Sequence, residues 1–115
     1  MKIAVVGSRT FNDYDLLKKS LDNLYPNISL IISGGAKGAD SLAEKYAKDE
    51  GIPTQIFKPN WKKYGKAAGF VRNKDIIAAS DMVIAFWDCV SHGTKNSIEH
   101  AYTMNKPVII VPDFV

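Results

Sequence analysis

Five short runs rich in valine and isoleucine alternate with segments of helical period, and this alternation restricts the fold more than any other feature of the chain. The apolar runs predict buried strands at residues 2–6, 29–32, 54–57, 82–86 and 107–111. The segments between them predict helices at residues 13–25, 39–50, 72–79 and 95–104. Strands that alternate with helices form a parallel sheet covered on both faces. We therefore expect an α/β fold: a single Rossmann-like, three-layer domain over residues 1–115, with five parallel strands in the order 3-2-1-4-5.

Composition excludes several classes of protein. Of the 115 residues, 46% are hydrophobic and 23% are charged, which is typical of a folded chain and not of a disordered one. The longest apolar run, residues 82–87, is far shorter than the roughly 20 residues of a membrane span. The N-terminus lacks the cleavage site of a secretory peptide, so we expect a cytoplasmic protein without a membrane partner. The single cysteine, Cys89, forms no internal disulfide and belongs to no zinc spacing, and we expect neither a metal nor a cofactor.

In the predicted sheet, ligands bind beyond the carboxyl ends of the strands, near the switch point between the first and fourth strands. The first strand ends in Gly7, Ser8 and Arg9, which place a hydroxyl and a guanidinium at that point. A guanidinium suits bidentate contact with a phosphate or a carboxylate. The alternative for Arg9 is an ion pair on the surface.

A glycine-rich turn follows the second strand: residues 33–40 read Ser-Gly-Gly-Ala-Lys-Gly-Ala-Asp and lead directly into a helix. Glycines let the backbone approach an anion, and the N–H groups at a helix start favour negative charge, so the turn predicts a phosphate cradle to which Lys37 adds charge. The spacing matches neither the nucleoside-triphosphate loop nor the dinucleotide fingerprint. The alternative is a tight turn whose glycines serve only the backbone geometry.

A second anion-friendly helix start follows the fourth strand, where Gly93 and Thr94 begin the last helix. Two cradles that face one crevice imply an elongated anionic ligand. The long connection at residues 58–69 carries Trp61 and Tyr64 among several lysines. A ring there would stack on a nucleobase as part of a ligand lid, or Trp61 would pack over the sheet edge as ordinary core.

These residues together resemble the SLOG superfamily, which joins the DprA/Smf proteins and the LOG cytokinin-activating phosphoribohydrolases, and in particular its small YspA-like branch, found in phage and bacterial genomes. The resemblance covers nearly the whole chain, and it implies binding of a nucleotide or a nucleotide-derived phosphorylated ligand. The residues that carry it, or that we expect to contact this ligand, are Gly7, Ser8, Arg9, Gly34, Gly35, Ala36, Lys37, Gly38, Asp40, Trp61, Tyr64, Gly65, Ala68, Gly69, Arg72, Asn73, Gly93 and Thr94. LOG relatives associate in pairs, which makes a homodimer one assembly to consider.

The resemblance to LOG enzymes places Arg72 on their catalytic arginine. Their catalytic glutamate falls on Ser97 of this chain, and Glu99 lies two residues further, a rotation of roughly 200° around a helix. Cleavage of a base from a ribose requires a carboxylate, which Ser97 does not supply. If the ligand is hydrolysed, the candidate catalytic residues are Arg72, Asp88 and Glu99, with Asp40 as a further substitute. The alternatives are that Asp40 caps a helix and that Asp88 is a turn residue.

Three functions follow from the sequence. The first is binding of a nucleotide-derived small molecule, in order to sense, sequester or process it. The second is a LOG-like phosphoribohydrolase that cleaves the N-glycosidic bond of a nucleoside monophosphate. The third is DprA-like binding of single-stranded DNA, which the net charge of +3 supports only weakly.

Overall fold

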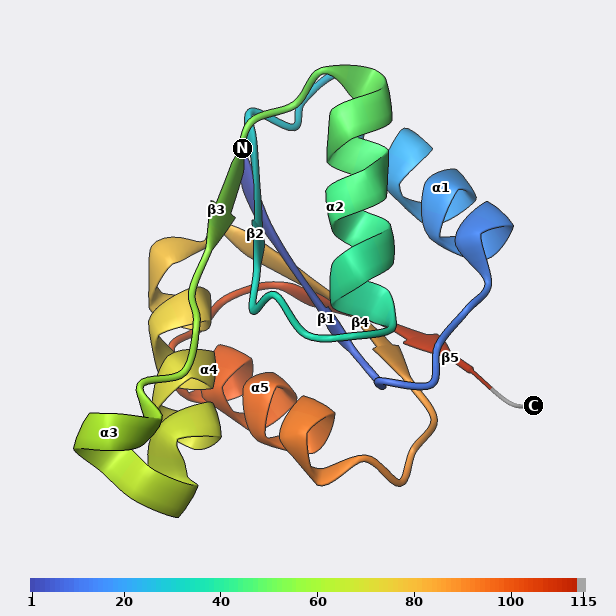
Figure 1. Ribbon diagram of the computed structural model, residues 1–115. Helices are drawn as coiled ribbons and strands as arrows, with labels where there is room; N and C mark the ends of the chain where they lie inside the picture. The colour runs from blue at the N-terminus through green and yellow to red at the C-terminus, as the bar shows by residue number, and fades with distance from the viewer. Residues whose placement is uncertain (114–115) are drawn as a thin grey trace.

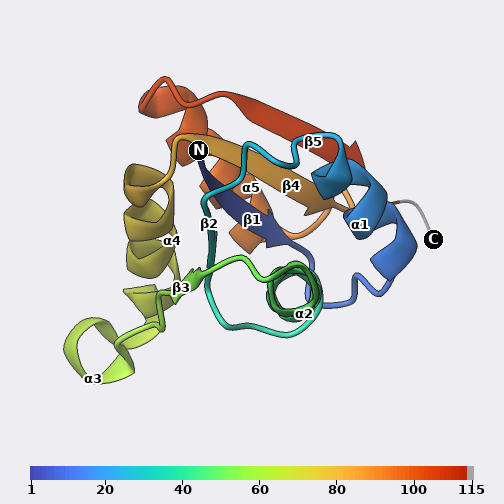
Figure 2. The same cartoon turned by 90° about the horizontal axis from the view of Figure 1, so that it is seen from above.

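The computed structural model describes residues 1–113, in which a parallel sheet lies between two layers of helices (Figures 1 and 2). The strands are β1 (Lys2–Gly7), β2 (Leu30–Ser33), β3 (Thr54–Ile56), β4 (Met82–Trp87) and β5 (Val108–Pro112). Their spatial order is β3-β2-β1-β4-β5, and every neighbouring pair is parallel. This confirms the predicted order and the Rossmann-like α/β class.

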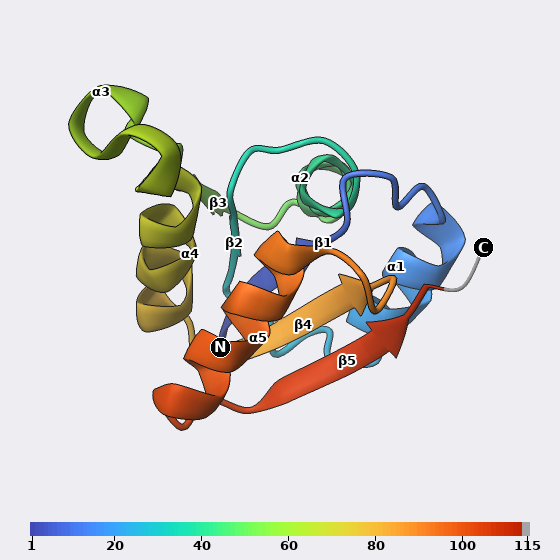
Figure 3. The same cartoon turned by 90° about the horizontal axis from the view of Figure 1, so that it is seen from below.

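The helices divide between the two faces of the sheet. They are α1 (Tyr14–Asp22), α2 (Ala39–Glu50), α3 (Trp61–Tyr64), the 3₁₀ turn η1 (Gly65–Ala67), α4 (Ala68–Ala79) and α5 (His92–Thr103). The first two cover one face, α4 and α5 cover the other, and α3 projects away from the body beside α4 (Figure 3). Within residues 1–113, none of these helices has the length and apolarity that crossing a membrane requires.

The central strand β1 explains why both faces need a helical cover. Successive side chains of a strand point to opposite faces. Ile3 and Val5 therefore pack with α1 and α2, while Ala4 and Val6 pack with α4 and α5, and all of them are buried. Because both faces are apolar, the strand reads as a continuous hydrophobic run.

The prediction that all five strands are buried is wrong for the two edges. Every residue of β3 is exposed, and β5 exposes Ile109 and Ile110 by 41% and 37%. An edge strand has a neighbour on one side only, and the helices centre on β1 and β4. The apolar residues of β3 and β5 are needed for sheet pairing more than for the core.

Several helix boundaries differ from those predicted, and two of the helices begin at a side-chain cap. α1 begins after Asp13, whose side chain accepts a hydrogen bond from the Leu16 amide at 3.0 Å, and it ends at Asp22, earlier than predicted. The connection expected to be a loop contains α3, which Asn60 caps by accepting from the Lys63 amide at 3.1 Å. α4 and α5 begin earlier than predicted, at Ala68 and His92.

We predict that Gly38→Ala destabilises the fold strongly. Gly38 precedes α2 with a φ of 77°, and a Cβ there would collide with the carbonyl oxygen of Ser8 and the backbone of Arg9. The backbone strain and the overlap together should lower the free energy of unfolding by about 3 kcal/mol or more in a denaturant titration. The control is Gly51→Ala: Gly51 has a φ of 68° but no atom within 4 Å of the added Cβ, so about 1 kcal/mol is expected. Equal losses in the two variants would contradict the close approach of α2 to β1.

Candidate functional site

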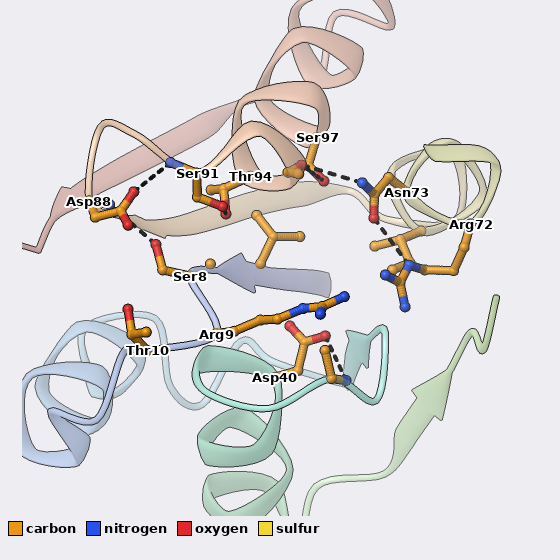
Figure 4. A pocket seen from close by; sticks show the side chains of 15 residues that line it. Ser8, Arg9, Thr10, Asp40, Arg72, Asn73, Asp88, Ser91, Thr94 and Ser97 are labelled. Atoms are coloured by element: carbon orange, nitrogen blue, oxygen red, sulfur yellow. Dashed lines mark hydrogen bonds between the residues drawn. The ribbon is translucent and has the colours of Figure 1, made fainter. Parts of the chain in front are cut away.

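A pocket of about 380 Å³ lies at the carboxyl ends of β1 and β4, bounded by the starts of α2 and α5 and by α4 (Figure 4). Many of the residues singled out in the sequence meet here. Those that line it are Gly7, Ser8, Arg9, Ala36, Asp40, Arg72, Asn73, Asp88, Gly93 and Thr94. The switch-point rule therefore locates the cavity correctly, because β1 and β4 are the neighbours from which the chain turns in opposite directions.

A second cavity of about 470 Å³ adjoins the first on the side of β3. Gly34, Gly35 and Lys37 line it, together with Pro59. Both cavities share Arg9, Ala36 and Arg72, so they form one crevice that runs past the glycine-rich turn.

The backbone amides of the glycine-rich turn do not have the partner that the sequence suggests. Those of Gly34 and Ala36 both donate to Asp40 Oδ2 at 3.1 Å, and that of Gly35 donates to Ser33 Oγ at 3.3 Å. Asp40 lies in the first turn of α2, so its carboxylate reaches back over the turn that precedes the helix. The anion that these amides bind is thus a side chain of the protein itself.

Gly34 also makes room for Arg72. The Nη1 atom of Arg72 donates to the Gly34 carbonyl oxygen at 2.7 Å, and a Cβ on Gly34 would lie only 2.5 Å from that nitrogen. The Nε atom of Arg72 donates to Asn73 Oδ1 at 3.1 Å. Arg72 therefore links α4 to the turn after β2, and much of its hydrogen-bonding capacity is used within the protein.

The charges of Asp40 and Arg72 influence each other inside the crevice. Burial raises the pKa of Asp40 above its ordinary value of 3.8, and the amides of Ala36 and Gly34 and the Arg72 charge oppose that shift. Burial likewise lowers the pKa of Arg72, which the negative charge of Asp40 opposes. The guanidinium remains protonated because its ordinary pKa is far above neutral.

At the opposite wall, hydrogen bonds hold the loop before α5 in place. Asp88 Oδ1 accepts from the amides of Val90 and Ser91 at 2.9 and 2.7 Å, and Asn73 Nδ2 donates to the Gly93 carbonyl oxygen at 3.3 Å. No residue between 1 and 113 accepts from the backbone N–H of Gly93 or Thr94, which both line the pocket. The start of α5 therefore presents unpaired donors and the positive end of a helix dipole to the cavity.

Arg9 extends across the pocket toward Arg72 and passes above Asp40 (Figure 4). Within residues 1–113 it makes no hydrogen bond and no ion pair, so the surface ion pair considered above is not present. Arg9 is thus an exposed positive charge that lines the crevice and has no partner among the described residues.

Several predicted residues lie elsewhere. Glu99 is exposed on α5 and lines neither cavity, as its rotation from Ser97 predicts. Trp61 and Tyr64 lie on the projecting α3, where they are 56% and 40% exposed, so they neither line the crevice nor pack as core. Gly38 lies against Ser8 and Arg9 and lines no cavity.

The pocket also includes residues that the sequence interpretation did not select, namely the apolar Val6 and Ile76 and the polar Thr10, Ser91 and Ser97. Thr10 and Ser91 follow the same two strand ends as the selected residues. Ser97 lies three positions after Thr94 and hence on the same helix face. Among residues 1–113, no group of three or more histidine, cysteine, aspartate or glutamate side chains is arranged to hold a metal ion.

Comparison with known proteins identifies the family. Residues 1–64, more than half of the chain, match the YspA, cpYpsA-related SLOG family. Gene 61 protein of Mycobacterium phage D29 is 31% identical over 117 residues, which cover 94% of each chain. The chain belongs to the YspA-related SLOG family.

Solved structures share the fold of this SLOG chain at low sequence identity. DNA processing protein A (DprA) from Streptococcus pneumoniae superimposes with a TM-score of 0.82 at 23% identity, over 99% of the SLOG chain and 51% of the DprA chain. DprA from Helicobacter pylori, described by its single-stranded DNA binding mode, gives 0.79 at 23% identity, over 100% and 66%. The protein TM1055 gives 0.68 at 20% identity, over 93% and 71%. The SLOG chain thus spans about half to two thirds of the two DprA chains.

We predict that Asp88→Ala lowers the free energy of unfolding by about 1 kcal/mol at pH 7, because the variant loses two hydrogen bonds to backbone amides. Those amides, of Ser91 and Val90, hold the pKa of Asp88 below its ordinary value of 3.8. Such a carboxylate stabilises the fold above its unfolded pKa and loses that effect as the pH falls through its folded pKa. Denaturation curves at several pH values should therefore show the difference from wild type narrowing below about pH 4. Asp75→Ala, at an exposed position of α4, is the control and should show no comparable loss.

Proposed function

We propose that the protein binds a nucleotide or a nucleotide-derived phosphorylated ligand in the crevice at the carboxyl ends of β1 and β4. One observation supports this above all: Arg9 lies in the crevice without a partner between residues 1 and 113, and the same cavity contains the unpaired N–H groups of Gly93 and Thr94. A guanidinium together with a helix N-terminus is a common arrangement for binding phosphate.

The position of the phosphate differs from the one that the glycine-rich turn suggested. Asp40 already occupies the amides of Gly34 and Ala36, and its negative charge opposes a second anion there. The start of α5 contributes free amides and the hydroxyls of Ser91 and Thr94, which lie 3.2 Å apart. We therefore assign the phosphate to α5 and Arg9.

The size of the crevice agrees with a nucleotide. Pockets for small organic ligands enclose about 300–1,000 Å³, and the two adjoining cavities measure about 380 and 470 Å³. The second cavity contains Lys37 next to Arg9 and Arg72, so a longer ligand would meet further positive charge there.

The experiment is thermal unfolding with a panel of nucleoside mono- and diphosphates. A ligand at 100 times its Kd should stabilise the fold by about 2.7 kcal/mol. Arg9→Ala should lose most of this stabilisation while unfolding normally without ligand, because the Arg9 side chain makes no hydrogen bond or ion pair with residues 1–113. Lys19→Ala removes an exposed charge on α1 and should keep the stabilisation. If no nucleotide stabilises the wild type, or if Arg9→Ala responds like Lys19→Ala, the proposal is wrong.

Two other functions have their own readouts. Of the three carboxylates considered for hydrolysis, Asp40 and Asp88 line the crevice, each with two backbone amides on one of its oxygens, and Glu99 lies outside it. Release of free base during incubation with a nucleoside monophosphate would add a phosphoribohydrolase activity. Binding of a single-stranded oligonucleotide that weakens steeply with salt, without any effect of mononucleotides, would instead favour the function named for Helicobacter pylori DprA.

A further inference from the structure

Asp40 is a buried carboxylate that accepts hydrogen bonds at only one of its two oxygen atoms. Its side chain lines the pocket although the residue is just 7% exposed. Oδ2 accepts from the amides of Gly34 and Ala36, and this pair of contacts fixes the carboxylate plane. The second oxygen, Oδ1, receives no hydrogen bond from residues 1–113.

Oδ1 is open to the cavity. Every fully enclosed side-chain nitrogen or oxygen atom in the described part of the chain has a hydrogen-bond partner. Because Oδ1 has none, it retains accessible surface, and the space next to it is the pocket that Asp40 lines. Figure 4 shows the carboxylate beneath the side chain of Arg9, facing the cavity.

No cation neutralises this oxygen at contact distance. No ion pair of the described residues involves Asp40, and Arg72 directs its Nη1 and Nε atoms to Gly34 and Asn73. A carboxylate in this state accepts hydrogen bonds and repels anions. A ligand group that meets Oδ1 must therefore be a hydrogen-bond donor and not an anion, and the donors that a nucleotide carries beside its phosphate are the hydroxyls of its sugar.

We propose that Asp40 determines specificity by accepting a hydrogen bond from a sugar hydroxyl of the bound nucleotide, so that the site selects ribose over deoxyribose. This inference rests on the proposed function, which places the phosphate at α5 and Arg9 on the other wall of the same cavity. The sugar of a nucleotide lies next to its phosphate, and carboxylates are common acceptors for ribose hydroxyls in nucleotide-binding sheets. A buried acceptor discriminates strongly against an analogue that lacks the hydroxyl, because the acceptor is then left without a partner.

The test compares ribonucleoside 5′-monophosphates with their 2′-deoxy and 3′-deoxy counterparts by calorimetric titration. Wild type should bind the ribo form at least about tenfold more tightly than one of the deoxy forms. In Asp40→Asn, the side-chain amide oxygen can still accept from the backbone amides of Gly34 and Ala36. The amide NH2 group, which donates hydrogen bonds, then replaces the Oδ1 acceptor. The ribo-to-deoxy ratio of this variant should fall well below the wild-type value, because a neutral amide replaces the charged acceptor, and its affinity for inorganic phosphate should rise because the opposing charge is removed.

The matched control is Ser41→Ala. The Ser41 hydroxyl donates to the Ala36 carbonyl oxygen at 2.9 Å, so it stabilises the same turn, but Ser41 lines neither cavity. This variant should keep the wild-type ratio. A ratio of one in Ser41→Ala would mean that any loosening of the turn removes the preference, and would overturn the direct contact.

The outcomes separate the two proposals. If the wild type binds ribo and deoxy forms equally, the role of Asp40 is wrong whatever the variant does, while the proposed function stands. The same holds if folded Asp40→Asn retains the wild-type ratio. If the wild type binds no nucleotide at all, the proposed function fails and this inference fails with it.

Discussion

Two backbone amides of the glycine-rich turn donate to the carboxylate of Asp40, and the geometry of the crevice depends on this contact. A buried charge is costly unless hydrogen bonds compensate for lost hydration. The compensation comes from the turn itself, with Arg72 near enough to lower the remaining cost. The contact therefore holds the end of β2, the start of α2 and the side chain of Arg72 in one arrangement, and α4 is linked to it through Arg72.

This internal anion changes how a glycine-rich turn is interpreted. Gly34 allows the close approach of a guanidinium, and Gly38 allows the close approach of the backbone after β1. Both glycines therefore serve the packing of the protein, and whether the turn also binds an anion stays a prediction. Unpaired donors of the crevice lie at the start of α5 and on Arg9, and the Lys37 amide in the turn likewise has no acceptor among residues 1–113. The proposed ligand accordingly lies between a fixed negative charge and a positive wall, and needs a polar, uncharged part as well as a phosphate.

Membership in the SLOG family does not by itself explain why one wall of the crevice carries a negative charge and the other a positive one. The DprA and TM1055 structures share the sheet and its helices at 20–23% identity, so their likeness concerns the fold. The same fold brings β1 and β4 side by side and opens a crevice between the starts of α2 and α5. The chemistry of the crevice depends on a few side chains, among which Arg9 and Asp40 carry opposite charges and form no ion pair with residues 1–113.

The sequence by itself determined the class of fold, the strand order and the place of the crevice. Each follows from local patterns: apolar runs of strand length, helical periodicity between them, and the polar or glycine-rich segments that begin at Ser8 and Gly34 after their strands and include Gly93 at a helix start. The exposed edge strands were not predicted, since burial depends on neighbours, and neither were the early starts of α4 and α5, which no side-chain cap marks.

Tertiary structure alone decided which polar groups remain available. The sequence shows that the turn after β2 has free amides before folding, but only packing brings Asp40 over them and Arg72 onto Gly34. A donor is available to a ligand only if it does not already donate to an acceptor of the protein. Which acceptors lie close enough depends on the three-dimensional arrangement, because they come from residues distant in the chain.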